Sequence, residues 1–262
     1  PRAGVGRLPR ALLERVGPHR VRLETPVRSV ERDGEAFVLR TARDTLHADA
    51  VVLATPAFVA AELVRGIDGS AAASLGAIPY ASTGVVHLVY PEDTAEALPE
   101  ATGFVVPRGR APMTAATFVS RKWPEAAFGT RAVVRCFVGA VGFEDVLDEP
   151  DQEIANAVCR HLAAFLPLPG RPTASSVVRW PRSMPQYEVG HLERIRAIED
   201  SLPAGIFLTG NAYHGVGVAD AVRSAGLAAE RVRVHLRAGS AAAELEDRRG
   251  NGRAPSRSEN VG

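Results

Sequence analysis

A short glycine-rich stretch between an apolar run and a helical pattern carries the residue types best suited to hold a ligand. Ile206–Thr209 is typical of a strand, Gly210–Gly215 predicts a turn, and a helix is predicted from Val218. The first N–H groups of such a helix lack helical partners and carry partial positive charge, so they suit an anion or a polarised ligand oxygen. Gly215 and Gly217 remove side chains where a ligand or a second backbone must come close.

The helix after this turn has an apolar stripe that predicts its buried face. Its members are Val218, Val222, Ala225, Ala229, Val232 and Leu236. Ordinary strand-to-helix connections show the same pattern of residues, so the pattern alone is also compatible with a turn that binds no ligand.

Other kinds of site have little support in the sequence. The seven histidines show no H-x-x-x-H spacing, no cysteine cluster accompanies them, and G-x-S-x-G does not occur, so we predict neither a metal centre nor a hydrolytic site. Cys136 and Cys159 each lie in an apolar run, which predicts buried free thiols in a reducing compartment.

The composition is that of a globular protein. The hydrophobic share is 46%, the charged share is 23% and the net charge is +1, which gives no strong field toward nucleic acid or an anionic membrane. No apolar stretch approaches the ~20 residues that a membrane helix needs. Only Lys122 among the 31 basic residues is a lysine, which indicates GC-rich coding.

The first quarter of the chain alternates short strands and helices. A helix is predicted at Leu8–Val16, and strands at Arg20–Leu23, Val27–Glu31 and Ala36–Arg40. His47–Pro56 is an apolar run typical of a central strand buried on both faces. We expect Thr55 to cap the next helix, with Pro56 at its first position.

The middle of the chain, from about Ile67 to Leu202, changes to several strands plus one long helix. Strands are predicted at Ser82–Tyr90, Gly103–Val106, Met113–Val119, Arg131–Val138 and Ser175–Trp180. The helix, Asp151–Leu166, has its apolar stripe on Ile154, Val158, Leu162 and Phe165. These elements predict an α+β domain with helices packed on an antiparallel sheet.

Several separated motifs, in the same order, resemble the protoporphyrinogen oxidase family of FAD-dependent flavoproteins, within the flavin amine oxidase superfamily. They are T-P-V-x-x-V from Thr25, A-D-x-V-V-L-A-T-P from Ala48, W-x-x-S-x-P-x-Y-x-x-G-H from Trp180 and G-x-x-Y-x-G-V-G-V-x-D-x-x-x-S-x-G from Gly210. The resemblance covers nearly the whole chain up to Leu236.

The resemblance implies that FAD is the cofactor and where it would bind. In the family, the main chain at the position of Val27 brackets the adenine edge, the strand before Thr55 crosses near FAD, and Trp180 would lie beside the ring. The remaining residues implied to contact the flavin are Gly210, Asn211, Val216, Gly217 and Val218. Because flavin N5 removes the hydride, we assign no catalytic residue and give His214 and Asp220 no acid–base role.

The resemblance further implies oxygen-dependent oxidation of a porphyrinogen to a porphyrin, a cytoplasmic step of haem synthesis. Coproporphyrinogen III is favoured and protoporphyrinogen IX is second. Arg108, Arg121 and Arg182 are candidates to bind the substrate's propionates. A flavin monoamine oxidase remains an alternative, although such enzymes end in a different glycine pattern. A second alternative is a truncated remnant that binds no FAD.

The expected fold class is α/β plus α+β, a partial two-dinucleotide-binding-domain flavoprotein with a mixed substrate domain. Residues 1–66 are expected to form part of the FAD-binding domain, 67–202 the substrate-binding domain, 203–238 the C-terminal FAD-binding strand and helix, and 239–262 a disordered tail. The strand–G-x-G-x-x-G–helix fingerprint is missing, so we expect a C-terminal portion without the N-terminal FAD-binding half. The resemblance also allows a homodimer of the intact enzyme.

Overall fold

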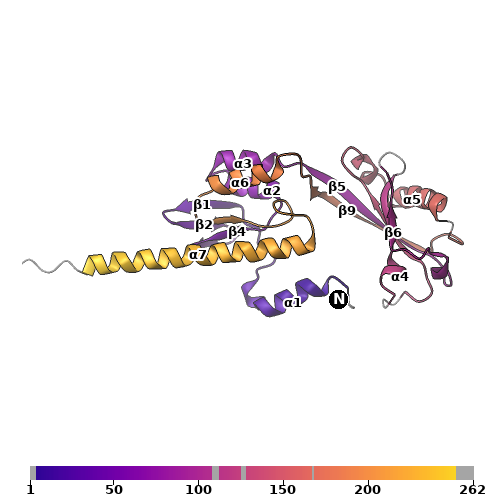
Figure 1. The fold of residues 1–262 in the computed structure, drawn as a ribbon, viewed down its shortest axis with the longest axis horizontal. Helices are drawn as coiled ribbons and strands as arrows, with labels where there is room; N and C mark the ends of the chain where they lie inside the picture. Colours follow the sequence, from indigo (N-terminus) through magenta and orange to yellow (C-terminus); the bar gives the residue numbers. More distant parts are fainter. Residues whose placement is uncertain (1–3, 108–111, 125–127, 167, 252–262) are drawn as a thin grey trace, which may run out of the picture. The chain divides into compact units, whose positions relative to one another are not determined.

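The computed structural model describes residues 4–107, 112–124, 128–166 and 168–251, which form two compact units. The sheet unit comprises residues 1–23 and 79–186, and the turn unit comprises residues 24–78 and 187–262 (Figure 1). The chain therefore changes unit near residues 23, 78 and 186. The sequence analysis predicted domain boundaries near residues 66 and 202. The later two changes differ from these because helices α3 (Gly69–Gly76) and α6 (His191–Ser201) pack on each other in the turn unit.

The sheet unit contains a five-stranded antiparallel sheet in the order β6-β7-β8-β5-β9. Its strands are β5 (Tyr80–Val89), β6 (Gly103–Val105), β7 (Met113–Phe118), β8 (Val133–Val138) and β9 (Ala174–Pro185). The other elements of this unit are α1 (Arg7–Val16), η1 (Pro18–Arg20), η2 (Ala95–Ala97), α4 (Val119–Lys122), η3 (Glu144–Leu147) and α5 (Asp151–Phe165). Helix α5 covers one face of the sheet, which confirms the predicted antiparallel sheet with a helix packed on it (Figure 1).

The core of the sheet unit follows from strand alternation. Val86 and Leu88 of β5 and Cys136 of β8 are fully buried against Val158 and Leu162 of α5. Burial raises the pKa of the Cys136 thiol to about 12, so this free cysteine is inert.

One member of the predicted α5 stripe is not buried. Phe165 is 52% exposed, because it is the last residue of the helix and its ring lies at the sheet edge, 5.7 Å from that of Phe104. Ile154, Val158 and Leu162 are buried as predicted.

The turn unit has strands between two helical layers. Its strands are β1 (Ser29–Asp33), β2 (Ala36–Arg40), β3 (Thr45–Ala48), β4 (Val51–Leu53) and β10 (Ile206–Leu208). Strands β1, β2 and β3 form an antiparallel sheet, and β4 pairs in parallel with β10. Helices α2 (Ala57–Val64), α3 and α6 lie on one side of the strands, and α7 (Val218–Asn251) runs along the other (Figure 1).

Two strand predictions in the first quarter are wrong. Arg20–Leu23 forms no strand, since Pro18 starts a 3-10 turn that ends at Arg20. His47–Pro56 contains two strands, β3 and β4, and Val52 of β4 is 42% exposed, so the run is not buried on both faces. Val51 and Leu53 of the same strand are buried, so one face of β4 packs on the core and the face that carries Val52 does not.

The predicted buried face of α7 is displaced by about one residue. Ser224 and Ala228 are buried, whereas Val218 and Val222 are 63% and 62% exposed. The buried side is fixed by a hydrogen bond of 2.9 Å between the hydroxyl groups of Thr209, after β10, and Ser224. Small residues are therefore buried where α7 approaches β10, and the larger apolar residues lie outside.

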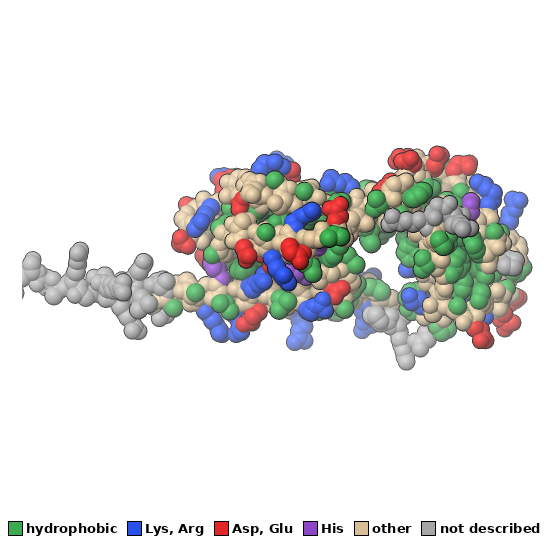
Figure 2. Space-filling view, turned by 45° about the horizontal axis from the view of Figure 1, so that its top comes forward, with side chains coloured by type: hydrophobic (Ala, Val, Ile, Leu, Met, Phe, Trp, Pro, Cys, Tyr) green, Lys and Arg blue, Asp and Glu red, His purple; other side chains and the backbone are tan. Residues whose placement is uncertain are grey.

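Helix α7 continues to Asn251, so residues 239–251 are helical although the sequence predicted a disordered tail from 239; residues 252–262 lie outside the described part. On the face of the molecule in Figure 2, acidic and basic side chains are interspersed, in agreement with a net charge of +1.

We predict that Val86→Ala lowers the free energy of unfolding of the sheet unit by roughly 2–3 kcal/mol, because two buried methyl groups are lost and a cavity remains. Val86 is 0% exposed, whereas Val105 of the same sheet is 81% exposed and supplies the matched control, Val105→Ala. Denaturant unfolding measures both. Equal losses in the two variants would contradict the assignment of this core.

Candidate functional site

Two chain segments leave parallel strands at one edge of the turn unit. Leu53 of β4 is in register with Leu208 of β10, and the Thr209 N–H donates to the Leu53 carbonyl at 3.1 Å. Because carboxyl ends of adjacent parallel strands share an edge, Thr55 and Gly210 follow at that edge.

Thr55 has a different role from the predicted cap. Helix α2 begins at Ala57 after Pro56, and no side chain caps it. The Thr55 hydroxyl oxygen is buried without a hydrogen-bond partner in the described part of the chain. Because buried hydroxyl groups are normally paired, this one is available to a bound ligand.

Tyr187 closes the glycine turn. Its hydroxyl group donates to the Asn211 carbonyl and accepts from the Gly215 N–H, both at 2.8 Å. The ring stacks on His191 with centroids 3.8 Å apart. Burial raises the pKa of Tyr187 and lowers that of His191, so both side chains stay neutral at pH 7. The sequence motif contained both residues, but their contacts with the turn are visible only in the structure.

A second clamp joins the turn to the two helices beside it. Nε2 of His214 lies 3.0 Å from Oε1 of Glu199 on α6, and Arg231 of α7 lies 3.3 Å from the other oxygen. The Glu199 side chain is 14% exposed, so both interactions are partly shielded from water. His214 therefore has a partner on α6 that holds the turn against this helix.

Asp220 is the group that approaches the turn glycines most closely. The Gly217 N–H donates to Asp220 Oδ2 at 3.2 Å. A Cβ atom on Gly215, whose φ is +129°, would lie 2.6 Å from the Asp220 carboxyl carbon. The prediction that a ligand or a second backbone requires glycine at 215 is therefore corrected, because a side chain of α7 fills that space.

The carboxylate of Asp220 also changes which ligand atoms suit the turn. It lies in the first turn of α7, where it interacts favourably with the helix dipole, and it pairs with Arg223 at 2.6 Å. A phosphate at the same place would meet this negative charge. The amides of Val218 and Ala219, which have no partner within the helix, therefore suit a neutral polarised oxygen better than an anion.

The predicted FAD-contacting residues fall into two groups. Those in or beside the turn are Thr55, Gly210, Asn211, Val216, Gly217 and Val218. Val27 is half-buried on the segment before β1 of the same unit, and Trp180 is 53% exposed on β9 of the sheet unit. Neither belongs to the turn.

The three arginines predicted to bind propionates differ in their surroundings. Arg121 donates to the carbonyl groups of Glu96 and Leu98 at 3.3 and 2.9 Å, which is a structural role. Arg182 has a φ of +44° beside an irregularity in the pairing of β5 and β9. Arg108 lies outside the described residues.

Over the described residues, no three or more His, Cys, Asp or Glu side chains are grouped so as to hold a metal ion. Within the same residues, no helix has both the length and the apolar character that crossing a bilayer requires.

Comparison with known proteins gives one family match. A model described as "Flavin containing amine oxidoreductase" matches residues 1–233. Coproporphyrinogen III oxidase of Bacillus subtilis is 33% identical over 76% of this chain and 43% of its own length. The chloroplastic protoporphyrinogen oxidase of Oryza sativa subsp. japonica is 28% identical over 90% of this chain and 47% of its own length.

Solved structures agree with the predicted fold class. A provisionally named protoporphyrinogen oxidase from Exiguobacterium sp. 255-15 has a TM-score of 0.74 and 29% identity, over 87% of this chain and 51% of that chain. Cyclohexylamine oxidase from Brevibacterium oxydans IH-35A has a TM-score of 0.64 at 18% identity, over 85% of this chain and 51% of that chain, and this likeness concerns the fold alone. The chain thus spans about half the length of the proteins it matches.

We predict that Tyr187→Phe accelerates amide hydrogen exchange of residues 211–217 by roughly 5- to 30-fold. The variant keeps the ring beside His191 but loses two hydrogen bonds to the turn, each worth about 1 kcal/mol. Exchange followed by mass spectrometry measures the effect. Tyr90→Phe, in the sheet unit, is the control. Equal exchange in Tyr187→Phe and the unmodified chain would show that the two hydrogen bonds of Tyr187 do not hold the turn.

Proposed function

The chain belongs to the family of flavin-containing amine oxidoreductases, and from this premise we propose that the protein containing it oxidises a porphyrinogen to a porphyrin with FAD and O2. Coproporphyrinogen III is the favoured substrate and protoporphyrinogen IX is second. The observation that carries the proposal is a clamped glycine turn beside an unpaired buried hydroxyl group, in a chain similar to named porphyrinogen oxidases over most of its length.

The residues at the turn fit a flavin. Backbone amides at the start of α7 and the Thr55 hydroxyl group offer donors to ring oxygens. When bound, FAD would accept hydride from the substrate. Tyr187, Glu199 and Asp220 would keep the turn in one conformation, so that little ordering is needed when FAD binds.

The proposal covers the wider setting as well. We assign the reaction to this chain together with the polypeptide encoded upstream of it, called here the long form, because the chain spans about half the length of its relatives. H2O2 would be the second product and the cytoplasm the place of reaction, as a step of haem synthesis. The long form would supply the other part of the FAD site.

The test compares residues 1–262 with the long form. We expect the long form to show flavin absorbance, to produce porphyrin fluorescence and H2O2, and to act faster on coproporphyrinogen III than on protoporphyrinogen IX. A long form that binds flavin and ignores both porphyrinogens but oxidises amines would replace the proposal with an amine oxidase. A long form without flavin would indicate a remnant.

We predict that Gly215→Ala weakens FAD binding by the long form at least tenfold. The new Cβ would clash with Asp220, and φ of +129° is strained for alanine by about 1–3 kcal/mol, so the turn must move. Gly239→Ala is the control, since nothing lies within 4 Å of a Cβ atom there. Flavin fluorescence titration measures both; unchanged affinity in Gly215→Ala would mean that the turn does not contact FAD.

A further inference from the structure

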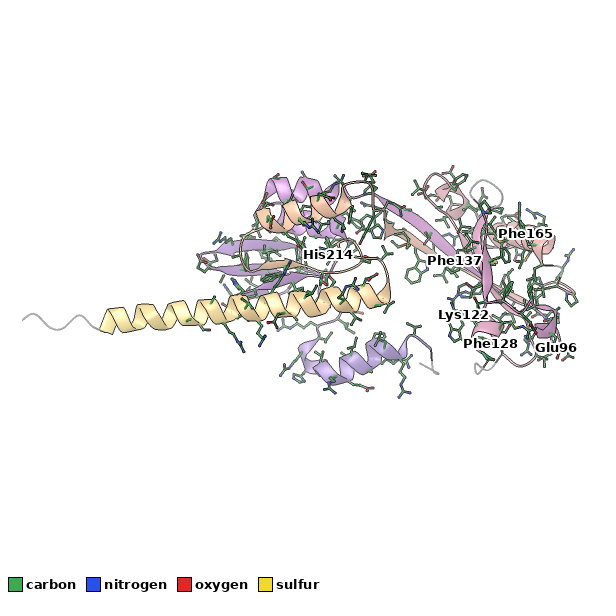
Figure 3. All side chains as sticks on the ribbon, viewed as in Figure 1. Glu96, Lys122, Phe128, Phe137, Phe165 and His214 are labelled. Atoms are coloured by element: carbon green, nitrogen blue, oxygen red, sulfur yellow. The ribbon has the colours of Figure 1, made fainter. Side chains whose placement is uncertain are left out.

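One face of the five-stranded sheet in the sheet unit is not covered by α5. Because side chains alternate along a strand, the residues between the core positions point to this second face. They include Val85, Phe137, Val178 and Trp180 on β5, β8 and β9, and the latter two are 41% and 53% exposed. In Figure 3, Phe137 and Lys122 lie on one side of the sheet and Phe165 of α5 lies on the other. The second face thus offers apolar and aromatic surface.

A row of polar side chains crosses the same face. His87 of β5 is in register with Arg135 of β8 and Ser176 of β9. Arg135 donates through Nε to His87 Nε2 at 3.2 Å, and His87 Nδ1 lies 3.4 Å from the Ser176 hydroxyl oxygen. Burial and the Arg135 charge lower the pKa of His87, which keeps it neutral and able to accept from Arg135. His87 thereby fixes the orientation of the Arg135 side chain.

Two cations share one aromatic ring beside this row. Nζ of Lys122 lies 5.0 Å from the centroid of the Trp123 ring, and Cζ of Arg135 lies 5.9 Å from it. Neither Lys122 nor Arg135 takes part in an ion pair among the described residues, whereas Arg131 is paired with Glu92. Both cations thus lie beside one ring, and a carboxylate that reached them would accept charge-assisted hydrogen bonds.

We propose that Lys122 and Arg135, held beside Trp123, bind a carboxylate group of the substrate. The proposal rests on the proposed function for its choice of ligand, a porphyrinogen bearing carboxylates on a large apolar ring. Arg135 offers a planar fork of donors to the carboxylate and Lys122 adds a point charge. The apolar residues on the same face cover part of the macrocycle. These are substrate-binding residues, and they take no part in hydride removal.

The test is a binding titration of the FAD-loaded long form with coproporphyrin III, the stable oxidised macrocycle, followed by porphyrin absorbance. We expect Arg135→Gln and Lys122→Gln each to weaken binding about tenfold, as expected for loss of a charged hydrogen bond. Lys122→Arg, which keeps the charge, should bind nearly as the unmodified protein does. Arg131→Gln is the matched control, because the guanidinium group of Arg131 already has a carboxylate partner.

A second ligand separates charge from folding. The methyl ester of coproporphyrin has no carboxylates, so the Gln variants should bind it as well as the unmodified protein does. Equal affinity of all variants for the acid would overturn the proposal while leaving the proposed function intact. No binding of the acid by the unmodified long form would overturn both. Weaker binding of the ester by the Gln variants would also overturn the proposal, since it would indicate a folding defect.

Discussion

Asp220 and Gly215 fit together too closely for any side chain at position 215, and the glycine turn depends on that fit. The same carboxylate accepts from the Gly217 N–H, so it fixes the start of α7 and the end of the turn together. Tyr187 then holds both ends of the preceding segment through its single hydroxyl group. A turn held in this way presents its remaining amides in one arrangement before any ligand arrives, which lowers the ordering cost of binding.

Strand alternation gives the sheet unit one buried apolar face and one face that carries cations. On β8, Cys136 is buried against α5, while its neighbours Arg135 and Phe137 face the other side of the sheet. The buried face contributes the apolar contacts of the core. The second face carries Lys122 and Arg135, and neither forms an ion pair with another described residue. Substitutions on the two faces should therefore differ in their effects, with loss of stability on one and loss of ligand affinity on the other.

Local patterns were sufficient for much of the fold. The five strands of the sheet and helix α5 were predicted because each has its own periodicity. The predictions failed where burial depends on a distant partner. Val52 is exposed because only one face of β4, that of Val51 and Leu53, packs on the core. Helix α7 buries Ser224 in place of Val222, and the Ser224 hydroxyl group forms a hydrogen bond with Thr209.

The sequence by itself determined the family, through motifs that contain glycines, Tyr187 and Asp220 at fixed spacing, because each motif consists of residues close together in the chain. Only the tertiary structure decided what each of them contacts. Tyr187 reaches the turn across 24 residues to Asn211, and Arg135 meets His87 across 48. Such contacts depend on strand register and helix packing, which arise from burial over the whole unit and leave no trace in local spacing.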